Sequence, residues 1–187
     1  MYGHFATIVS YPGIETWRSL DALIEGLAAK FPESSAMMVK FREAAESLGQ
    51  DALEEVYLET FEMRAECALY AGHQIFSEDW RRGAFMAALK EQYRVHGISI
   101  GLELPDHLSM LLRYLESLAP GEEMEELIGD CIIPAVRKVQ AAIEGRSPYS
   151  HVLEALLHCL PPRLASEPEF EEISCRTSSL SLFPILH

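Results

Sequence analysis

One short stretch has the residue order of a nucleophile elbow, the turn that presents the catalytic serine of an α/β-hydrolase. It reads Gly97-Ile98-Ser99-Ile100-Gly101, and Asp106 and His151 follow it in the order of the hydrolase triad. Such a turn needs a strand before the serine and a helix directly after it. Here a charged helical stretch precedes it and Leu102-Glu103-Leu104-Pro105 follows. The pattern favours a loop between helices, with a small serine hydrolase as an alternative.

Glutamates and histidines at helical spacing are the second set of residues that could do chemistry. Glu103 precedes His107 by four residues, and Glu154 precedes His158 by four. Dimetal sites in helical bundles use a Glu-x-x-His step instead, and none of the seven histidines has a glutamate three residues before it. The His-Glu-x-x-His motif of zinc proteases is absent too. We therefore expect no metal site.

The charge and composition narrow the possible partners. The 187 residues are 49% hydrophobic, enough for one domain with a proper core. With 15 Lys and Arg against 29 Asp and Glu, the net charge of -14 argues against nucleic acid and against an anionic membrane face. An acidic balance of this size fits a cationic partner or simple solubility.

The cysteines and the N-terminal residues indicate the compartment. Four cysteines lie far apart without a Cys-x-x-Cys pair: Cys67, Cys131, Cys159 and Cys175. We interpret them as reduced thiols of a cytoplasmic protein. The first residues lack the basic region of a signal peptide, and no window approaches the roughly 18 apolar residues that cross a bilayer. We expect no direct membrane insertion.

Helical periodicity runs along almost the whole chain, and strand alternation is nearly missing. We predict an all-α fold of about seven to nine helices in one domain, residues 1–160. The expected helices cover 16–30, 34–48, 51–63, 78–95, 105–118, 121–145 with a kink or break at Pro134, and 148–159. Residues 161–187 form a tail that is acidic and then apolar, and we expect the tail to pack on the body.

The helix predicted to start at Pro105 holds the most distinctive corner. Proline suits the first helical position, and Asp106 in the first turn would meet the positive end of the helix dipole. His107 follows, and it has two interpretations. Its side chain is buried and hydrogen-bonded, or it titrates near neutral pH. A continuous apolar stripe then runs along the helix: Leu108, Leu111, Leu112, Leu115 and Leu118.

Two other predicted helices have contrasting faces. On the helix over 51–63, Tyr57 and Phe61 share an apolar face, and five acids line the opposite side: Asp51, Glu55, Glu59, Glu62 and Glu66. Like charges at this spacing repel by a few tenths of a kcal/mol per pair, so the acidic side is tolerated or used. On the helix over 78–95 we expect Trp80 to point inward and Arg81 and Arg82 to form a solvated face.

Four short pieces, in this order and at these separations, resemble the NarJ branch of the TorD/DmsD/NarJ chaperones, the redox enzyme maturation proteins. They are Val56-Tyr57-Leu58-Glu59-Thr60-Phe61, Cys67-Ala68-Leu69-Tyr70, Arg81-Arg82-Gly83-Ala84-Phe85 and Glu103-Leu104-Pro105-Asp106-His107-Leu108. The resemblance covers roughly residues 53–118. Thr60 stands where the wider family often has leucine.

The resemblance implies an all-α cytosolic chaperone that is absent from the finished enzyme. Such proteins bind the N-terminal peptide of a molybdenum oxidoreductase's catalytic subunit, typically of the respiratory nitrate reductase type, until molybdo-bis(pyranopterin guanine dinucleotide) is inserted into that client. The peptide-binding residues implied here are Tyr57, Phe61, Tyr70, Glu103, Pro105, Asp106 and His107. The resemblance also implies that the chaperone has no catalytic residue and no permanently bound cofactor of its own. We expect a monomer or a dimer. A permanent acidic subunit of an enzyme complex is the remaining alternative.

Overall fold

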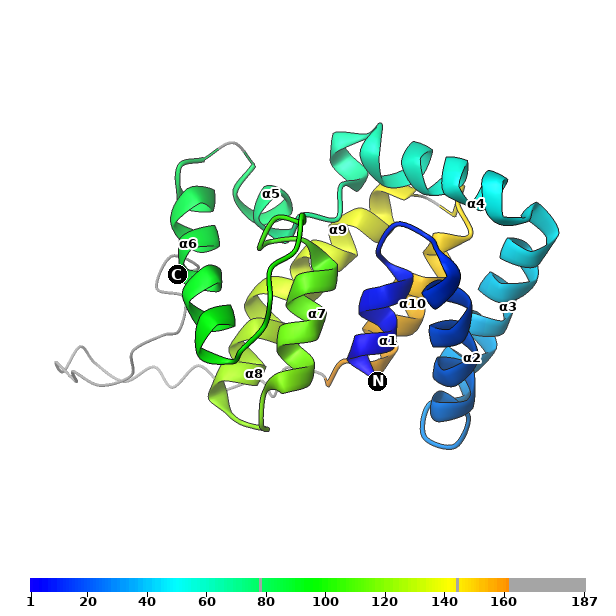
Figure 1. Ribbon diagram of the computed structural model, residues 1–187, viewed down its shortest axis with the longest axis horizontal. Coiled ribbons are helices and arrows are strands. Elements are labelled where there is room, and N and C mark those ends of the chain that lie inside the picture. Colours follow the sequence, from blue (N-terminus) through cyan, green and yellow to red (C-terminus); the bar gives the residue numbers. More distant parts are fainter. Residues whose placement is uncertain (78, 144, 162–187) are drawn as a thin grey trace, which may run out of the picture.

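Helices account for nearly all the regular structure in the computed structural model, which describes residues 1–77, 79–143 and 145–161 (Figure 1). The elements are α1 (Tyr2–Ile8), α2 (Ile14–Ala28), α3 (Pro32–Leu48), α4 (Gln50–Tyr57), the π-helical η1 (Leu58–Glu62), the 3-10 turn η2 (Ala65–Cys67), α5 (Ala71–Phe76), α6 (Arg81–Val95), α7 (Leu108–Ser117), α8 (Glu122–Glu126), the π-helical η3 (Leu127–Ile132), α9 (Ile133–Ile143) and α10 (Tyr149–Cys159). The all-α prediction is confirmed.

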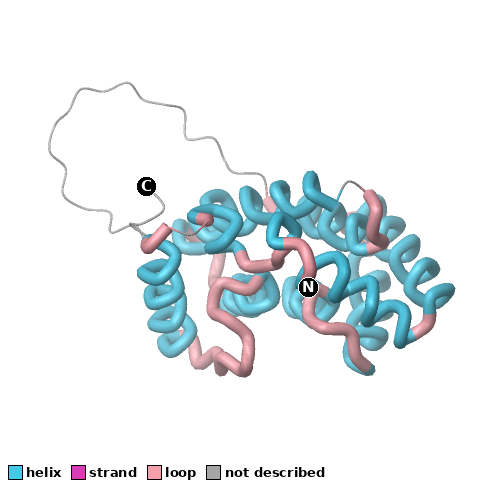
Figure 2. The backbone as a smooth tube through the Cα atoms, turned by 90° about the horizontal axis from the view of Figure 1, so that it is seen from above, coloured by secondary structure: helices cyan, strands magenta, loops and turns pink. Residues whose placement is uncertain are grey.

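The core is formed mainly around α1, α7 and α10. Helix α1 packs on α2 and α7, and α10 packs on α3 and α9. In Figure 1 the α2–α3 hairpin closes one end of the molecule and α6 stands at the other, with α4 along one edge. Figure 2, seen from above, shows helices along most of the described chain, joined by loops.

The apolar stripe predicted for the helix after Pro105 is confirmed in α7. Leu108, Leu111, Leu112 and Leu115 are all buried, and so are Met110 and Tyr114 on the other side of the same helix. Arg113, Glu116 and Ser117 are exposed on the remaining side of the helix. Helix α7 thus packs into the core along its apolar side, and the candidate site is built at its first residues.

The irregularity predicted at Pro134 is present as a π-helical turn just before the proline. Proline has no N–H to donate to the carbonyl four residues before it, so a regular α-helix cannot continue through that point. The chain passes from α8 into the π-helical η3 and resumes as α9 one residue before Pro134. A wider turn of this kind accommodates the missing hydrogen bond without ending the helix.

Two predicted helix starts are wrong. Helix α7 begins at Leu108, with His107 as its N-cap, so Pro105 and Asp106 lie in the preceding turn. Helix α6 begins at Arg81, and Trp80 is 79% exposed instead of pointing inward. Asp106 has a distant partner, Arg82, and Trp80 faces solvent. Local sequence specifies neither of these surroundings.

Cys67, Cys131 and Cys159 are buried. The fourth cysteine and the predicted tail beyond Pro161 lie outside the described residues. Within the described ranges, no helix is both long and apolar enough to span a membrane.

Candidate functional site

The Glu103–Leu108 segment, which turns at Pro105 and Asp106, docks against the residues that lead into α5. The Ala71 amide donates to the Asp106 carbonyl at 2.7 Å, and the Leu108 amide donates to the Leu69 carbonyl at 2.8 Å. Tyr70 and His107 therefore face each other in an isolated antiparallel bridge. We call this junction the Asp106 corner: residues 69–72 together with residues 103–108. It joins parts of the chain more than thirty residues apart and fixes the start of α7.

Asp106 is the buried charge of this corner. Its side chain is 0% exposed, and Oδ2 accepts a hydrogen bond from Nε of Arg82 at 2.8 Å. The guanidinium of Arg82 also lies over the Tyr70 ring, 5.7 Å from its centroid. A buried carboxylate needs a cation or several donors to offset its loss of water, and Arg82 on α6 supplies that cation. The prediction that Arg82 lies on a solvated face is wrong, whereas Arg81 is exposed.

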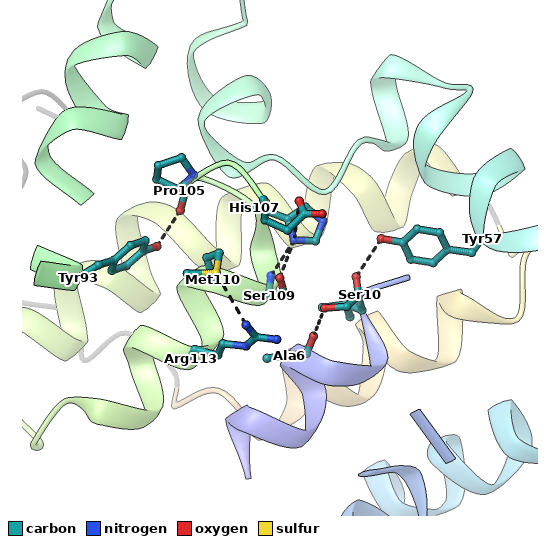
Figure 3. A network of polar contacts seen from close by, with 11 residues as sticks. Ala6, Ser10, Tyr57, Tyr93, Pro105, His107, Ser109, Met110 and Arg113 are labelled. Atoms are coloured by element: carbon teal, nitrogen blue, oxygen red, sulfur yellow. Dashed lines mark hydrogen bonds and ion pairs between the residues drawn. The ribbon is translucent and has the colours of Figure 1, made fainter. Parts of the chain in front are cut away.

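Helix α6 is held against the same corner at a second point. The Tyr93 hydroxyl donates to the Pro105 carbonyl at 2.7 Å, as Figure 3 shows, and Tyr93 is fully buried. A buried hydroxyl and a turn carbonyl thereby satisfy each other. The turn that precedes α7 is positioned by α6 at both Pro105 and Asp106.

Gly72 leaves room for the Arg82–Asp106 pair. A Cβ at this position would lie 2.7 Å from Oδ2 of Asp106 and 3.1 Å from Cγ of Arg82. Gly72→Ala is therefore expected to lower the free energy of unfolding by about 2 kcal/mol, the usual cost of overpacking a filled interior. Urea denaturation measures this change.

Gly83→Ala on α6 is the matched control for Gly72→Ala. A Cβ at position 83 meets nothing within 4 Å, and alanine is the better helix former, so the control should be neutral or stabilised by up to about 1 kcal/mol. Equal effects of the two substitutions would contradict the close approach at Gly72.

His107 is a buried cap and not a surface group. Its Nδ1 accepts a hydrogen bond from the Ser109 amide at 3.2 Å and lies 2.7 Å from the Ser109 hydroxyl (Figure 3). Burial, together with the nearby charge of Arg113, lowers the pKa of His107 to about 4. The ring is therefore neutral at physiological pH, which agrees with the interpretation of a buried, hydrogen-bonded side chain and not with a titration near neutrality.

Tyr57 and Phe61 are part of an aromatic cluster in the core. Their ring centroids are 5.2 Å apart, and both rings contact Tyr149 of α10, at 5.7 and 5.1 Å. The Tyr57 hydroxyl donates to the Val9 carbonyl at 3.2 Å, and Figure 3 shows it pointing toward the end of α1. Only 3% of Tyr57 and 2% of Phe61 are exposed. The two rings join α4 and η1 to α1 and α10.

Tyr70 and Glu103 are the members of the predicted set that solvent reaches. Tyr70 is partly exposed, and its ring packs edge-on against His107 at 5.2 Å. The Glu103 side chain is 48% exposed. Partial burial raises the pKa of the Glu103 carboxyl, and the neighbouring Glu62 adds to the rise. Partial burial raises the pKa of the Tyr70 hydroxyl, and the nearby carboxylates of Glu103 and Glu62 add to the rise. An acidic surface around one tyrosine therefore covers the Asp106 corner.

The seven peptide-binding residues inferred from the sequence thus divide into two sets. Five are buried: Tyr57, Phe61, Pro105, Asp106 and His107. Tyr70 and Glu103 form the accessible part. Sequence reasoning missed three residues that build the corner, namely Gly72, Arg82 and Tyr93. The four-piece pattern does contain Arg82, but helical periodicity alone places it on the surface.

The geometry does not support a triad around Ser99. The Gly97–Gly101 stretch is a loop after α6, and the described residues place no strand before the serine. Asp106 pairs with Arg82, whereas His151 lies on α10. No group of three or more His, Cys, Asp or Glu side chains among the described residues is arranged to hold a metal.

Comparison with known proteins places the chain in a family. A family model described as the nitrate reductase delta subunit matches residues 22–144 of the 187. The chain belongs to this family, and the resemblance predicted from the four short pieces is confirmed.

The related proteins are assembly chaperones by name. The chain is 28% identical over 173 residues to the nitrate reductase molybdenum cofactor assembly chaperone NarJ of Escherichia coli K12. The aligned region covers 89% of this chain and 72% of that protein. The chain is 26% identical over 165 residues to a probable chaperone of the same name from Bacillus subtilis 168, covering 85% and 87%. The family is one of chaperones and not of enzymes, so the serine hydrolase alternative is wrong.

Proposed function

We propose that this protein is a cytosolic assembly chaperone for a molybdenum oxidoreductase of the nitrate reductase type. It binds the N-terminal segment of the catalytic subunit and holds that subunit until molybdo-bis(pyranopterin guanine dinucleotide) has been inserted. The cofactor belongs to the client and not to the chaperone. The observation that carries this proposal is the similarity to NarJ chaperones along 89% of the chain.

The surface over the Asp106 corner is the proposed contact for the client peptide. We call it the client face and define it as Tyr70, Glu62, Glu103 and Leu104. Leu104 is 45% exposed, so the face combines an aromatic ring and an apolar side chain with two carboxylates. Such a surface suits a segment with apolar and basic residues, because the charges are complementary and the ring gives a rigid anchor. The buried members of the motif shape this face from beneath.

Titration calorimetry with the N-terminal peptide of the client's catalytic subunit tests the proposal. Tyr70→Ala should weaken binding about 10-fold, as expected when an interface anchor is truncated. Glu103→Gln should weaken it mainly at low ionic strength, because a partly exposed charge is screened by salt.

The controls for both changes lie away from the client face. Ile14→Ala removes a large side chain at the start of α2 that is 76% exposed, and Glu43→Gln removes an exposed carboxylate on α3. Equal losses in the controls, or no affinity of the unaltered protein at low salt, would contradict the client face.

A further inference from the structure

Arg82 contacts two parts of the Asp106 corner at once. Its Nε donates to Oδ2 of Asp106 at 2.8 Å, and its guanidinium lies over the ring of Tyr70 at 5.7 Å. The side chain of Arg82 is 24% exposed, so most of it is enclosed between α6 and the corner. A planar guanidinium can donate along its edge and stack on a ring with its face, and lysine cannot do both.

The position of the Asp106 carboxylate depends on this contact. Among the described residues, Oδ1 of Asp106 is buried and accepts no hydrogen bond, so Arg82 supplies the side-chain donor that this carboxylate has. A Cβ at Gly72 would meet both members of the pair, which leaves little room for another arrangement. Without Arg82, the buried Asp106 carboxylate would have to move to reach another hydrogen-bond donor.

A shift at Asp106 would be passed on to the client face through the main chain. The Asp106 carbonyl accepts from Ala71, and the Leu69 carbonyl accepts from Leu108, so residues on both sides of Tyr70 are bound to residues on both sides of His107. Glu103 lies in the same segment, three residues before Asp106. The Tyr70 ring and the Glu103 carboxylate therefore depend on one docked junction.

We infer that Arg82 is a positioning residue of the client face: it touches Tyr70 and Asp106 and holds the ring and the 103–107 segment in their relative places. The inference rests on the proposed function, because it concerns the surface that takes the client peptide. Arg82 need not contact the peptide, since its effect is exerted through Tyr70.

Amide hydrogen exchange tests the positioning without any client. In Arg82→Ala, the amides of Ala71 and Leu108 should exchange faster relative to the Leu27 amide in α2. Arg81→Ala is the matched control, because Arg81 neighbours Arg82, is exposed and pairs with Asp79. Unchanged exchange at Ala71 and Leu108 in Arg82→Ala would overturn the inference.

Calorimetry with the client's N-terminal peptide then links the position to binding. Arg82→Ala and Tyr70→Ala should each weaken affinity about 10-fold relative to the unaltered protein. The double variant should also be only about 10-fold weaker than the unaltered protein, because both changes disrupt the same contact. Arg82→Lys is the second variant, which retains a cation beside Asp106 for folding. It should remain about 3-fold weaker than the unaltered protein, since an ammonium does not stack as a guanidinium does.

The outcomes separate this inference from the function on which it rests. Normal affinity in Arg82→Ala, or losses in Arg82→Ala and Tyr70→Ala that simply add, would overturn the positioning role and leave the proposed function standing. Absence of binding by the unaltered protein would overturn the proposed function, and the inference with it.

Discussion

Arg82→Met is expected to lower the free energy of unfolding by about 3 kcal/mol, the order of the cost of removing one partner from a buried ion pair. The substitution keeps a long apolar side chain over Tyr70 but leaves Asp106, which is 0% exposed, without its cation. Urea denaturation at neutral pH measures the loss from the midpoint and slope of the transition.

The double variant Arg82→Met/Asp106→Asn distinguishes a charge effect from a packing effect. With the carboxylate neutralised, no buried charge is left unpaired, and the double variant should recover about 1–2 kcal/mol relative to Arg82→Met alone. Arg81→Met, which changes an exposed neighbour, should stay within about 0.5 kcal/mol of the unaltered protein. A double variant as unstable as the sum of two independent losses would show that the pair is not a unit.

Acidification is expected to destabilise the protein through His107 by about 3 kcal/mol, as linkage gives for a pKa near 4 in the folded state. In the unfolded chain the imidazole binds a proton below about pH 6.5. In the folded protein it remains neutral down to about 4. The unfolded state therefore takes up the proton first, so this stabilisation is complete above pH 6.5 and is lost as the pH falls toward 4.

His107→Asn isolates this effect from the other groups that titrate in acid. Asparagine is a good N-cap, so its side-chain oxygen can take the place of Nδ1 as the acceptor for the Ser109 amide. The stability advantage of the unaltered protein over the variant should shrink by about 3 kcal/mol between pH 7 and pH 4. A pH-independent difference, or an imidazole that titrates near 6.5 in NMR spectra, would contradict the burial of His107.

Much of the fold follows from local patterns in the sequence. The period of the leucines in α7 is visible without a structure, and so is the helix irregularity at Pro134, because both depend on residues within one or two turns. The start of α7 is different. Asp106 looks like a first-turn acid, but its carboxylate is engaged by Arg82, which is 24 residues earlier in the chain. A contact of this separation is not encoded in local propensity.

The candidate site shows the same limit of helical periodicity. Tyr57 and Phe61 lie on one face in the sequence, and that face is indeed apolar and turned inward. Periodicity alone cannot distinguish a face that lines a binding surface from one that fills the core. The ring contacts with Tyr149, about ninety residues away in the chain, place both side chains inside. The accessible contacts are left to Tyr70 and Glu103, which periodicity does not single out.

A chaperone of this kind binds its client before the cofactor is loaded and is absent from the finished enzyme. The decisive experiment is to purify the client's catalytic subunit from cells that do and do not make molybdenum cofactor, with this protein present in both. We predict that the protein co-purifies with the cofactor-free subunit and is lost from the molybdenum-loaded one. Equal, stoichiometric association with the loaded enzyme would identify a permanent subunit and contradict the account.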